Sequence, residues 1–136
     1  MADKFEIKLP WPPTALSPNA RAHWAKKAKT AANYRYTCKL ASKSVLQFKR
    51  EEVAALKELV SAGGQIHVFI DFYPPNRRQR DDDNVVAAFK SGRDGLADAL
   101  GIDDCHFRTH PFLHSDKVVK PLGEVRVVIT GRGPEA

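Results

Sequence analysis

Alternation of apolar and polar residues predicts the strands of this chain. The clearest case runs from Gln65 to Tyr73, where Ile66 and every second residue after it are apolar and would face a core. The same alternation predicts a short strand at Phe5 to Leu9 and a last strand within GEVRVVITG, residues 123–131. The segment from His106 to His114 is expected to be extended as well, despite Pro111. Four strands are therefore expected.

Spacings of three and four residues predict helices between these strands. The longest helix is expected from Trp24 onward, with one face buried along its whole length. A shorter helix is expected at Glu51 to Ser61, ended by Gly63 and Gly64. The predicted buried face of the long helix consists of Trp24, Ala28, Ala31, Tyr34, Cys38, Ala41, Val45 and Phe48, and its solvent side carries Lys27, Lys29, Lys39 and Lys43.

A third helix is expected to begin at Asp83 and Asn84 and to run to about Leu100. An Asp or Asn side chain at a helix start can accept a hydrogen bond from a backbone amide that has no partner within the helix. Gly101 is suited to end the helix, because glycine readily adopts the left-handed conformation found there. The core side of this helix is marked by Val85, Phe89, Leu96 and Leu100.

These elements predict one small α/β (α+β) domain over residues 1–136. A mixed sheet of about four strands would pack on two main helices. No apolar stretch reaches the length that spans a bilayer, and the amino terminus does not read as a secretory signal. We therefore expect no membrane partner and a cytoplasmic location. The two cysteines, Cys38 and Cys105, fit no disulfide framework and are expected to be reduced thiols.

Charge is distributed unevenly along the chain. The segment from Asp81 to Asp104, which we call the acidic focus, holds seven acidic and two basic residues and has a net charge of −5. Because the whole chain has a net charge of +6, the remaining residues carry +11. A basic body around an acidic focus fits a polyanionic partner together with a metal ion better than a small neutral metabolite. The alternative is a set of scattered, solvated lysines; for Lys27 and Lys29 this alternative and a contact with phosphate are both open.

The acidic focus begins in the segment NRRQRDDDN, residues 76–84. If Arg80 to Asp83 is extended, Asp81 and Asp83 point the same way, and two convergent carboxylates suit Mg²⁺, which prefers oxygen ligands. The alternative is structural, because Asp83 would also cap the predicted helix and Asp81 would favour its positive end. The adjacent arginines Arg77, Arg78 and Arg80 are candidates for contacts with flanking phosphates.

Two further features lie downstream of this segment. Asp103 and Asp104 follow the third helix, and a carboxylate from this pair would reach the same metal ion if the next strand lies beside the Gln65 to Tyr73 strand. Lys90 lies nearly two helical turns after Asp83 and would face the same site, where it would balance charge on a phosphate. The alternative for Lys90 is a surface ion pair with Asp94.

Several of these stretches together resemble a known family. They are KLPWPPTALSPNARAHW near the start, RDDDN followed by FKSGRDGLADALGIDD, and the closing apolar strand. In that order they are similar to the RusA family of Holliday-junction resolvases, over most of the chain from Phe5 to about Thr130. The chain departs from the family pattern at Asp82, where an apolar residue is usual, and in about three extra residues between Asn84 and Lys90.

The resemblance implies a RusA-like fold and a Mg²⁺-dependent homodimer that nicks four-way DNA junctions in two strands, in recombination and repair; Mn²⁺ would be a possible substitute. Simpler branched DNA is an alternative substrate. The implied catalytic residues are Asp81, Asp83, Asp104 and Lys90, and the expected metal ligands are Asp81, Asp83, Asp103 and Asp104. From their charge and position, the residues expected to contact DNA are Arg77, Arg78, Arg80, Asn84, Lys27 and Lys29.

Two other function classes remain open from the sequence. A DNA-binding protein without catalysis would share the basic surface, and a metal-dependent phosphohydrolase acting on nucleotides would share the carboxylates. The series His106, His110 and His114 could indicate a zinc site, although its spacing matches no zinc pattern and polar strand positions are the simpler interpretation. Trp11 and Trp24 would either stack on bases or anchor the core.

Overall fold

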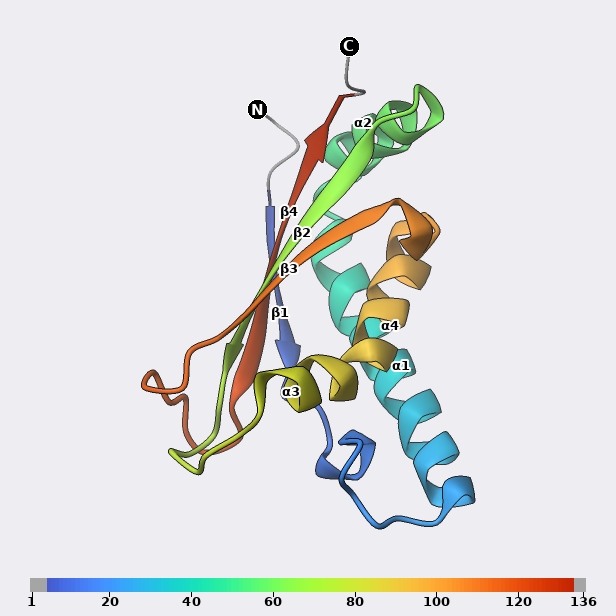
Figure 1. Cartoon of the computed structure of the whole chain (residues 1–136). Coiled ribbons are helices and arrows are strands. Elements are labelled where there is room, and N and C mark those ends of the chain that lie inside the picture. Colours follow the sequence, from blue (N-terminus) through green and yellow to red (C-terminus); the bar gives the residue numbers. More distant parts are fainter. Residues whose placement is uncertain (1–4, 134–136) are drawn as a thin grey trace.

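A computed structural model describes residues 5–133 and shows a four-stranded sheet (Figure 1). Strand β4 is antiparallel to both of its neighbours, β1 and β2, whereas β2 and β3 are parallel. The order across the sheet is β1-β4-β2-β3. This confirms the predicted α+β class and the mixed sheet. The strands are β1 (Phe5–Pro10), β2 (Gln65–Tyr73), β3 (Phe107–Leu113) and β4 (Glu124–Arg132).

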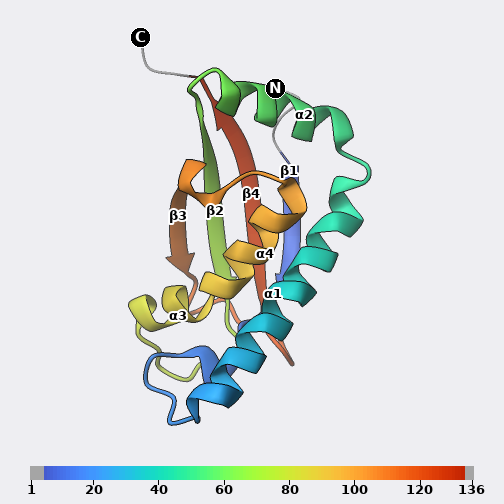
Figure 2. The same cartoon turned by 90° about the vertical axis from the view of Figure 1, so that its right-hand side faces the viewer.

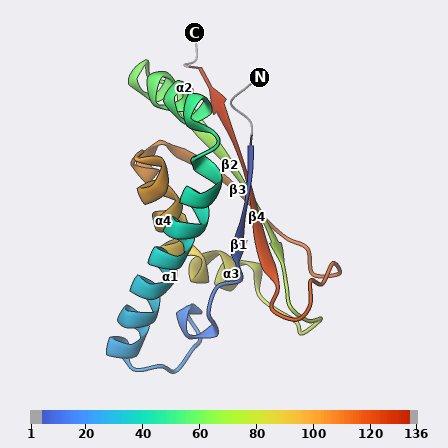
Figure 3. The ribbon, with the colours of Figure 1, turned by 180° about the vertical axis from the view of Figure 1, so that it is seen from behind.

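The helices cover one face of this sheet and leave the other face open, as Figures 2 and 3 show from two sides. The two that pack most extensively on one another are α1 (Trp24–Leu46) and α4 (Lys90–Leu100). The shorter helices are α2 (Arg50–Ser61) and α3 (Asp82–Ala88), with 3₁₀ turns η1 (Thr14–Leu16) and η2 (Asp104–His106). Within residues 5–133 no helix combines the length and the apolar character needed to cross a membrane.

Strand alternation builds the core, because one side of every strand faces the helices. In β2 every second residue, Ile66, Val68, Ile70 and Phe72, is buried on the side that faces the helices, and Val85, Phe89, Leu96 and Leu100 are buried from the helix side as predicted. Gly101 ends α4 in the left-handed conformation, with φ of 70°, also as predicted. The strand residues of this core are Phe5, Ile7, Leu9, Ile66, Val68, Ile70, Phe72, Val125, Val127 and Ile129.

Helices α1 and α4 approach each other closely because α4 presents glycine at the contact. A Cβ atom added at Gly95 would lie 2.3 Å from the carbonyl oxygen of Arg35 and 3.1 Å from Cβ of Cys38. Outside this contact, Arg35 donates two hydrogen bonds to Asp98, at 2.7 and 2.9 Å, and they lower the pKa of that carboxyl. Both cysteines are free thiols, in agreement with the prediction.

The predicted buried face of α1 is wrong at both ends. Trp24 is 75% exposed and Phe48 is 79% exposed. Trp24 is the first residue of a helix that extends past the sheet, and Phe48 lies beyond the last helical residue, Leu46, so neither meets the core. The buried residues of α1 are Tyr34, Cys38, Ser42 and Leu46.

The third predicted helix, from Asp83 to Leu100, is in fact two helices. The chain turns at Phe89, whose amide bonds to the carbonyls of both Val85 and Val86, and α4 begins at the next residue. Phe89 is buried at this turn, with its ring 5.4 Å from that of Phe72 and nearly perpendicular to it. The break lets both short helices direct apolar residues into one core.

We expect Gly95→Ala to destabilise the fold. Alanine is favoured over glycine inside an exposed helix by about 1 kcal/mol, so a stabilising effect would follow if α1 were not so close. The added methyl group instead overlaps the α1 backbone, and overpacking of this kind costs about 1–3 kcal/mol in the free energy of unfolding. Urea denaturation measures the difference. Gly133→Ala is the control, since its methyl group would meet nothing within 4 Å; a Gly95→Ala protein as stable as the parent would contradict the contact.

Candidate functional site

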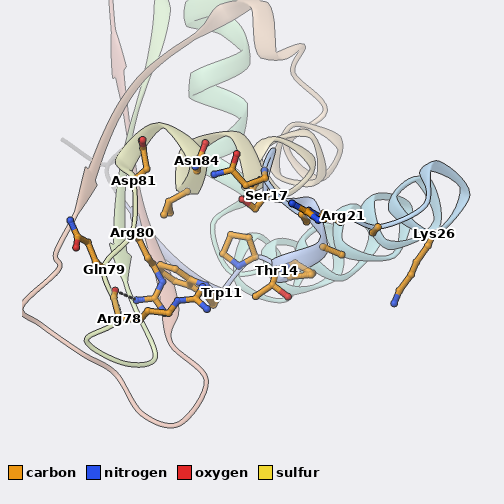
Figure 4. Close-up of a pocket in the computed structure, with 18 residues that line it drawn as sticks. Trp11, Thr14, Ser17, Arg21, Lys26, Arg78, Gln79, Arg80, Asp81 and Asn84 are labelled. Atoms are coloured by element: carbon orange, nitrogen blue, oxygen red, sulfur yellow. Dashed lines mark hydrogen bonds between the residues drawn. The ribbon is translucent and has the colours of Figure 1, made fainter.

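A groove of about 680 Å³ lies between two loops that are far apart in the sequence. One wall is the proline-rich loop after β1, residues 11–22, together with Lys26 in the first turn of α1, and the other is the basic loop after β2 with the start of α3. Figure 4 shows Arg78, Arg80 and Asp81 on the second wall and Arg21 and Lys26 on the first. The groove therefore gathers four basic side chains and one carboxylate.

The first wall is fixed to the core at its start. The hydroxyl group of Tyr34, a buried residue of α1, donates a hydrogen bond of 2.6 Å to the carbonyl oxygen of Pro10, and burial raises the pKa of Tyr34. The next residue, Trp11, packs on Phe72 with ring centroids 6.1 Å apart and planes nearly perpendicular. Trp11 thus anchors the loop on the core, which was one of its two predicted roles.

The second wall is organised by Arg80. Its guanidinium group lies 5.4 Å from the centroid of the Trp11 ring, which links the two walls by a cation–π contact. Arg80 also donates to the carbonyl oxygens of Asn76 and Arg78, at 3.0 and 2.9 Å, and to the amide oxygen of Asn76 at 2.8 Å. All of these acceptors are neutral. Partial burial, together with the charge of Arg78, lowers the pKa of Arg80, and among residues 5–133 no carboxylate pairs with its guanidinium group.

The acidic edge of the groove is the start of α3. Asp81 is the residue that caps the helix, because Oδ1 of its side chain accepts from the amide of Asp83 at 2.9 Å. The predicted cap at Asp83 is therefore displaced by two residues, and Asp83 lies in the first turn. Within residues 5–133 the Asp83 carboxylate makes no hydrogen bond or ion pair. Both carboxylates are exposed at the surface.

Asp103 and Asp104 lie at a different place. Asp103 caps η2 through a hydrogen bond from the amide of Cys105, 2.9 Å long, which lowers the pKa of Asp103. Asp104 forms an ion pair of 3.3 Å with Arg93 of α4. In Figure 1 this turn lies beside the upper half of the sheet, whereas α3 lies beside the lower half. Among residues 5–133, no three His, Cys, Asp or Glu side chains gather closely enough to hold a metal ion.

The sequence predicted that Asp104 would reach the metal site of Asp81 if the strand after Asp104 lies beside β2. That condition is met, but it does not bring the two residues together. Strand β3 does lie beside β2, with Ile66 opposite Phe107 and Phe72 opposite Leu113. Because the pair is parallel, the residues just before β3 lie near the start of β2, whereas the basic loop leaves from the end of β2. Parallel pairing therefore separates Asp104 from the loop that leads to Asp81.

Lys90 does not share a helical face with Asp83, because the break at Phe89 lies between them. Its ammonium group pairs with Asp94 at 3.8 Å, and its side chain is 66% exposed. This is the surface pair that the sequence left open as the alternative. Within residues 5–133, Lys90 therefore pairs with Asp94 and not with Asp81 or Asp83.

The remaining predicted DNA contacts divide into two groups. Arg78, Arg80 and Asn84 line the groove. Arg77, Lys27 and Lys29 do not line it; Lys27 donates to the carbonyl oxygen of Ser17 at 3.5 Å, and Lys29 is exposed on α1. The prediction overlooked Arg21 and Lys26, which are also basic residues beside the proline-rich loop. Their closeness in sequence to Trp11 was the available signal, but nothing in the sequence showed that the loop turns toward Arg80.

Comparison with known proteins adds a relative without an assigned activity. The chain is 41% identical over 125 residues to an uncharacterized protein of Xylella fastidiosa (strain Temecula1 / ATCC 700964). The matched region covers 92% of this chain and 75% of that protein. No family model matches the chain.

The cap at Asp81 gives a prediction about α3. Asp81→Ala removes the acceptor for the Asp83 amide and should lower the free energy of unfolding by about 0.5–2 kcal/mol, whereas Asp81→Asn keeps an acceptor and should change it little. Thermal or urea unfolding of the two variants measures the contrast. Equal stabilities for Asp81→Ala and Asp81→Asn would show that the cap contributes nothing.

Proposed function

This chain belongs to the same protein family as the Xylella fastidiosa protein, and we propose that it is a Mg²⁺-dependent endodeoxyribonuclease that nicks branched DNA. The observation that carries the proposal is the groove, where four cations meet Asp81, the one acid among the described residues that line it. The likeness of the sequence to the RusA family supports the same assignment. Four-way junctions and simpler branches are the candidate substrates.

The groove has the features expected of a contact with a phosphate backbone. Most contacts that position a protein on DNA are made by basic and amide side chains with phosphate oxygens. Arg78 and Arg80 on one wall, and Arg21 and Lys26 on the other, could bind phosphates on either side of a strand. Arg80 is well prepared for this role, because its acceptors are neutral and its position is fixed by three hydrogen bonds.

The metal proposal rests on the donor chemistry of Asp81 and Asp83. Mg²⁺ is commonly held by one or two carboxylates together with waters and substrate phosphates, and two exposed carboxylates beside a phosphate groove fit that pattern. When bound, the ion would supply a Lewis acid that lowers the pKa of water and stabilises charge on the departing oxygen. Asp104 remains a prediction from the resemblance, since Arg93 holds it elsewhere in this structure.

The remaining roles follow from the positions of the side chains. Asn84 follows the acidic run, lines the groove and offers an amide to a phosphate or sugar. Lys90 would have to leave Asp94 to approach a substrate; at 3.8 Å and mostly exposed, that ion pair is weak. Two nicks placed symmetrically on one branch need two copies of the site, so the proposal includes a homodimer.

A contact between the groove and phosphates predicts a change in salt dependence. Replacing one arginine from each wall, Arg21→Ala and Arg78→Ala in separate proteins, should weaken DNA binding and reduce the log–log salt slope by about 1 per arginine. Fluorescence anisotropy with a labelled Y-fork at several salt concentrations measures both quantities. Arg50→Ala on α2 is the matched control. Arg50→Ala should keep the parental slope. If Arg21→Ala and Arg78→Ala keep it as well, the groove does not bind DNA.

Cleavage tests the carboxylates separately from binding. With labelled four-way junction, Y-fork and linear duplex, we expect nicks only in the branched substrates and only with Mg²⁺. Asp83→Asn should abolish cleavage while leaving binding intact, and Asp82→Asn, a neighbouring exposed acid, is the control. Asp104→Asn in the same assay shows whether that residue takes part.

The outcomes distinguish the function classes. Cleavage by Asp83→Asn at the parental rate would place the reacting site elsewhere. Binding without cleavage by the parental protein, whatever the metal, would leave a DNA-binding protein without catalysis. Hydrolysis of nucleotides with no preference for branched DNA would identify the phosphohydrolase.

A further inference from the structure

The three histidines in and around β3 lie in separate places. On the open face of the sheet, the ring of His110 stacks on that of Phe69 with centroids 4.5 Å apart. His114 bonds to Asp71 at 2.8 Å, and His106 lies in the turn η2 rather than in an extended segment as predicted. The zinc site that their spacing left open therefore does not form among residues 5–133. The exposed aromatic residues of this face include Phe69 and Phe112.

The other face of β3 borders a second pocket, of about 170 Å³, between the β3 edge of the sheet and the helices α3 and α4. Ile70 and Phe89 give it apolar walls, and Thr109 of β3 adds a hydroxyl group. Among the described residues, the charged ones that line it are Lys90 and Arg93, and both are cations. We call this space the Arg93 pocket.

The Arg93 pocket and the groove lie on opposite faces of α3. Asn84 and Val85 line the groove, whereas Val86 and Ala87 line the pocket. Asp83 precedes Val86 by three residues and Ala87 by four, so it lies on the pocket side of the helix. The exposed carboxylate of Asp83, which the proposed function assigns to a metal ion, is therefore one helical turn from the lining of the pocket.

Arg93 is bound less completely than Arg35, an arginine of α1 that also pairs with an aspartate. Arg35 donates two hydrogen bonds to Asp98, of 2.7 and 2.9 Å. Nη2 of Arg93 lies 3.3 Å from Oδ2 of Asp104, which is a longer contact. The Nε of Arg93 is buried and has no hydrogen-bond partner within residues 5–133. An unpaired buried donor is rare in folded proteins and needs a physical reason, and the binding of an anion is one such reason.

An oxyanion would satisfy both cations of the pocket. The guanidinium group of arginine presents parallel N–H donors that match two oxygens of a phosphate, and lysine adds a point charge. The side chain of Arg93 is 31% exposed and that of Lys90 is 66% exposed, so both can be reached from solvent. Their partners Asp104 and Asp94 are not among the described residues that line the pocket, and ion pairs this exposed are weak. An anion can therefore replace them.

We propose that the Arg93 pocket binds a phosphate group, with Arg93 donating from Nε and a terminal nitrogen and with Lys90 beside it. The inference rests on the proposed function to the extent that the phosphate belongs to DNA. A strand whose phosphates bind in the groove would pass the start of α3 and present a further phosphate to the pocket, beside Asp83. Arg93 is then a phosphate-binding residue of the site.

Phosphate binding would also change the state of Asp104. In this structure Arg93 holds that carboxylate through their ion pair. A phosphate that takes the donors of Arg93 leaves Asp104 without its cation, and the carboxylate becomes free to bind a metal ion. Substrate and metal ligand would thus be coupled through one arginine.

The test is titration of the parental protein with inorganic phosphate, followed by NMR of the arginine Nε–H signals. Phosphate should shift the Arg93 signal to saturation and leave the Arg35 signal in place, because Arg35 lies outside the pocket. Sodium chloride at equal ionic strength should shift neither signal. Arg93→Lys, which has no Nε–H of this kind, identifies the Arg93 signal. Absence of a saturable shift at Arg93, or an equal shift with chloride, would overturn the proposal.

Variants measure the size of the effect. Arg93→Lys keeps the charge and should weaken phosphate binding about ten-fold, the effect of losing one charge-assisted hydrogen bond. Arg35→Lys, at the other aspartate-paired arginine, is the matched control and should bind phosphate as the parent does. Parental affinity in a folded Arg93→Lys protein would overturn the proposal. If that variant does not fold, Lys90→Ala at its exposed position decides in the same way.

DNA binding separates the two sources of phosphate. If the phosphate belongs to DNA, Arg93→Gln should reduce the log–log salt slope on a labelled Y-fork by about 1. An unchanged slope would overturn the assignment to DNA and leave free phosphate as the ligand. The phosphate titration contains neither DNA nor Mg²⁺. A failure of the proposed nuclease function, seen as no cleavage by the parental protein, would therefore leave the shift at Arg93 unaffected.

Discussion

The close contact between α1 and α4 at Gly95 is the constraint on which the rest of this structure depends. A helix backbone packed against a helix backbone leaves no room for a side chain, so the position of α1 over the sheet is fixed within narrow limits. That position lets the Tyr34 hydroxyl group donate a hydrogen bond to the carbonyl oxygen of Pro10, which fixes where the proline-rich loop begins. It also places Phe89 between the rings of Tyr34 and Phe72, which sets the direction in which α3 leaves the core.

The groove proposed to bind DNA is formed by loops, carries four cations and borders on carboxylates. It therefore suits a backbone whose phosphates are to be positioned near a metal ion.

The strands, the core and the fold class could be predicted from the sequence because they depend on local alternation. Ile70 and Phe72 on β2 are buried as the period of two requires, and Gly101 ends its helix as its lack of a side chain allows. The candidate site was predictable only in composition. Asp81, Arg78, Arg80 and Asn84 share one groove, but its other wall comes from a loop some sixty residues earlier, and no local pattern encodes that meeting.

The failed predictions have physical causes of the same kind. The helix from Asp83 to Leu100 is continuous in its local pattern, and tertiary burial of Phe89 breaks it. Lys90 and Asp104 were assigned to the site of Asp81 from helix periodicity and from the resemblance to the RusA family. The helix break at Phe89 and the parallel pairing of β2 with β3 instead leave Lys90 paired with Asp94 and Asp104 paired with Arg93. Strand direction is a property of the whole sheet and cannot be read from the alternation of one strand.

One detail of β3 also bears on how the protein behaves at high concentration. This strand is at the edge of the sheet, where unpaired backbone groups would ordinarily offer a template for a strand of another molecule. Pro111 lies in its middle, opposite Ile70, and has no amide hydrogen to contribute to such a ladder. The sheet can therefore expose apolar rings on its face while its β3 edge resists the edge-to-edge growth that leads to fibrils.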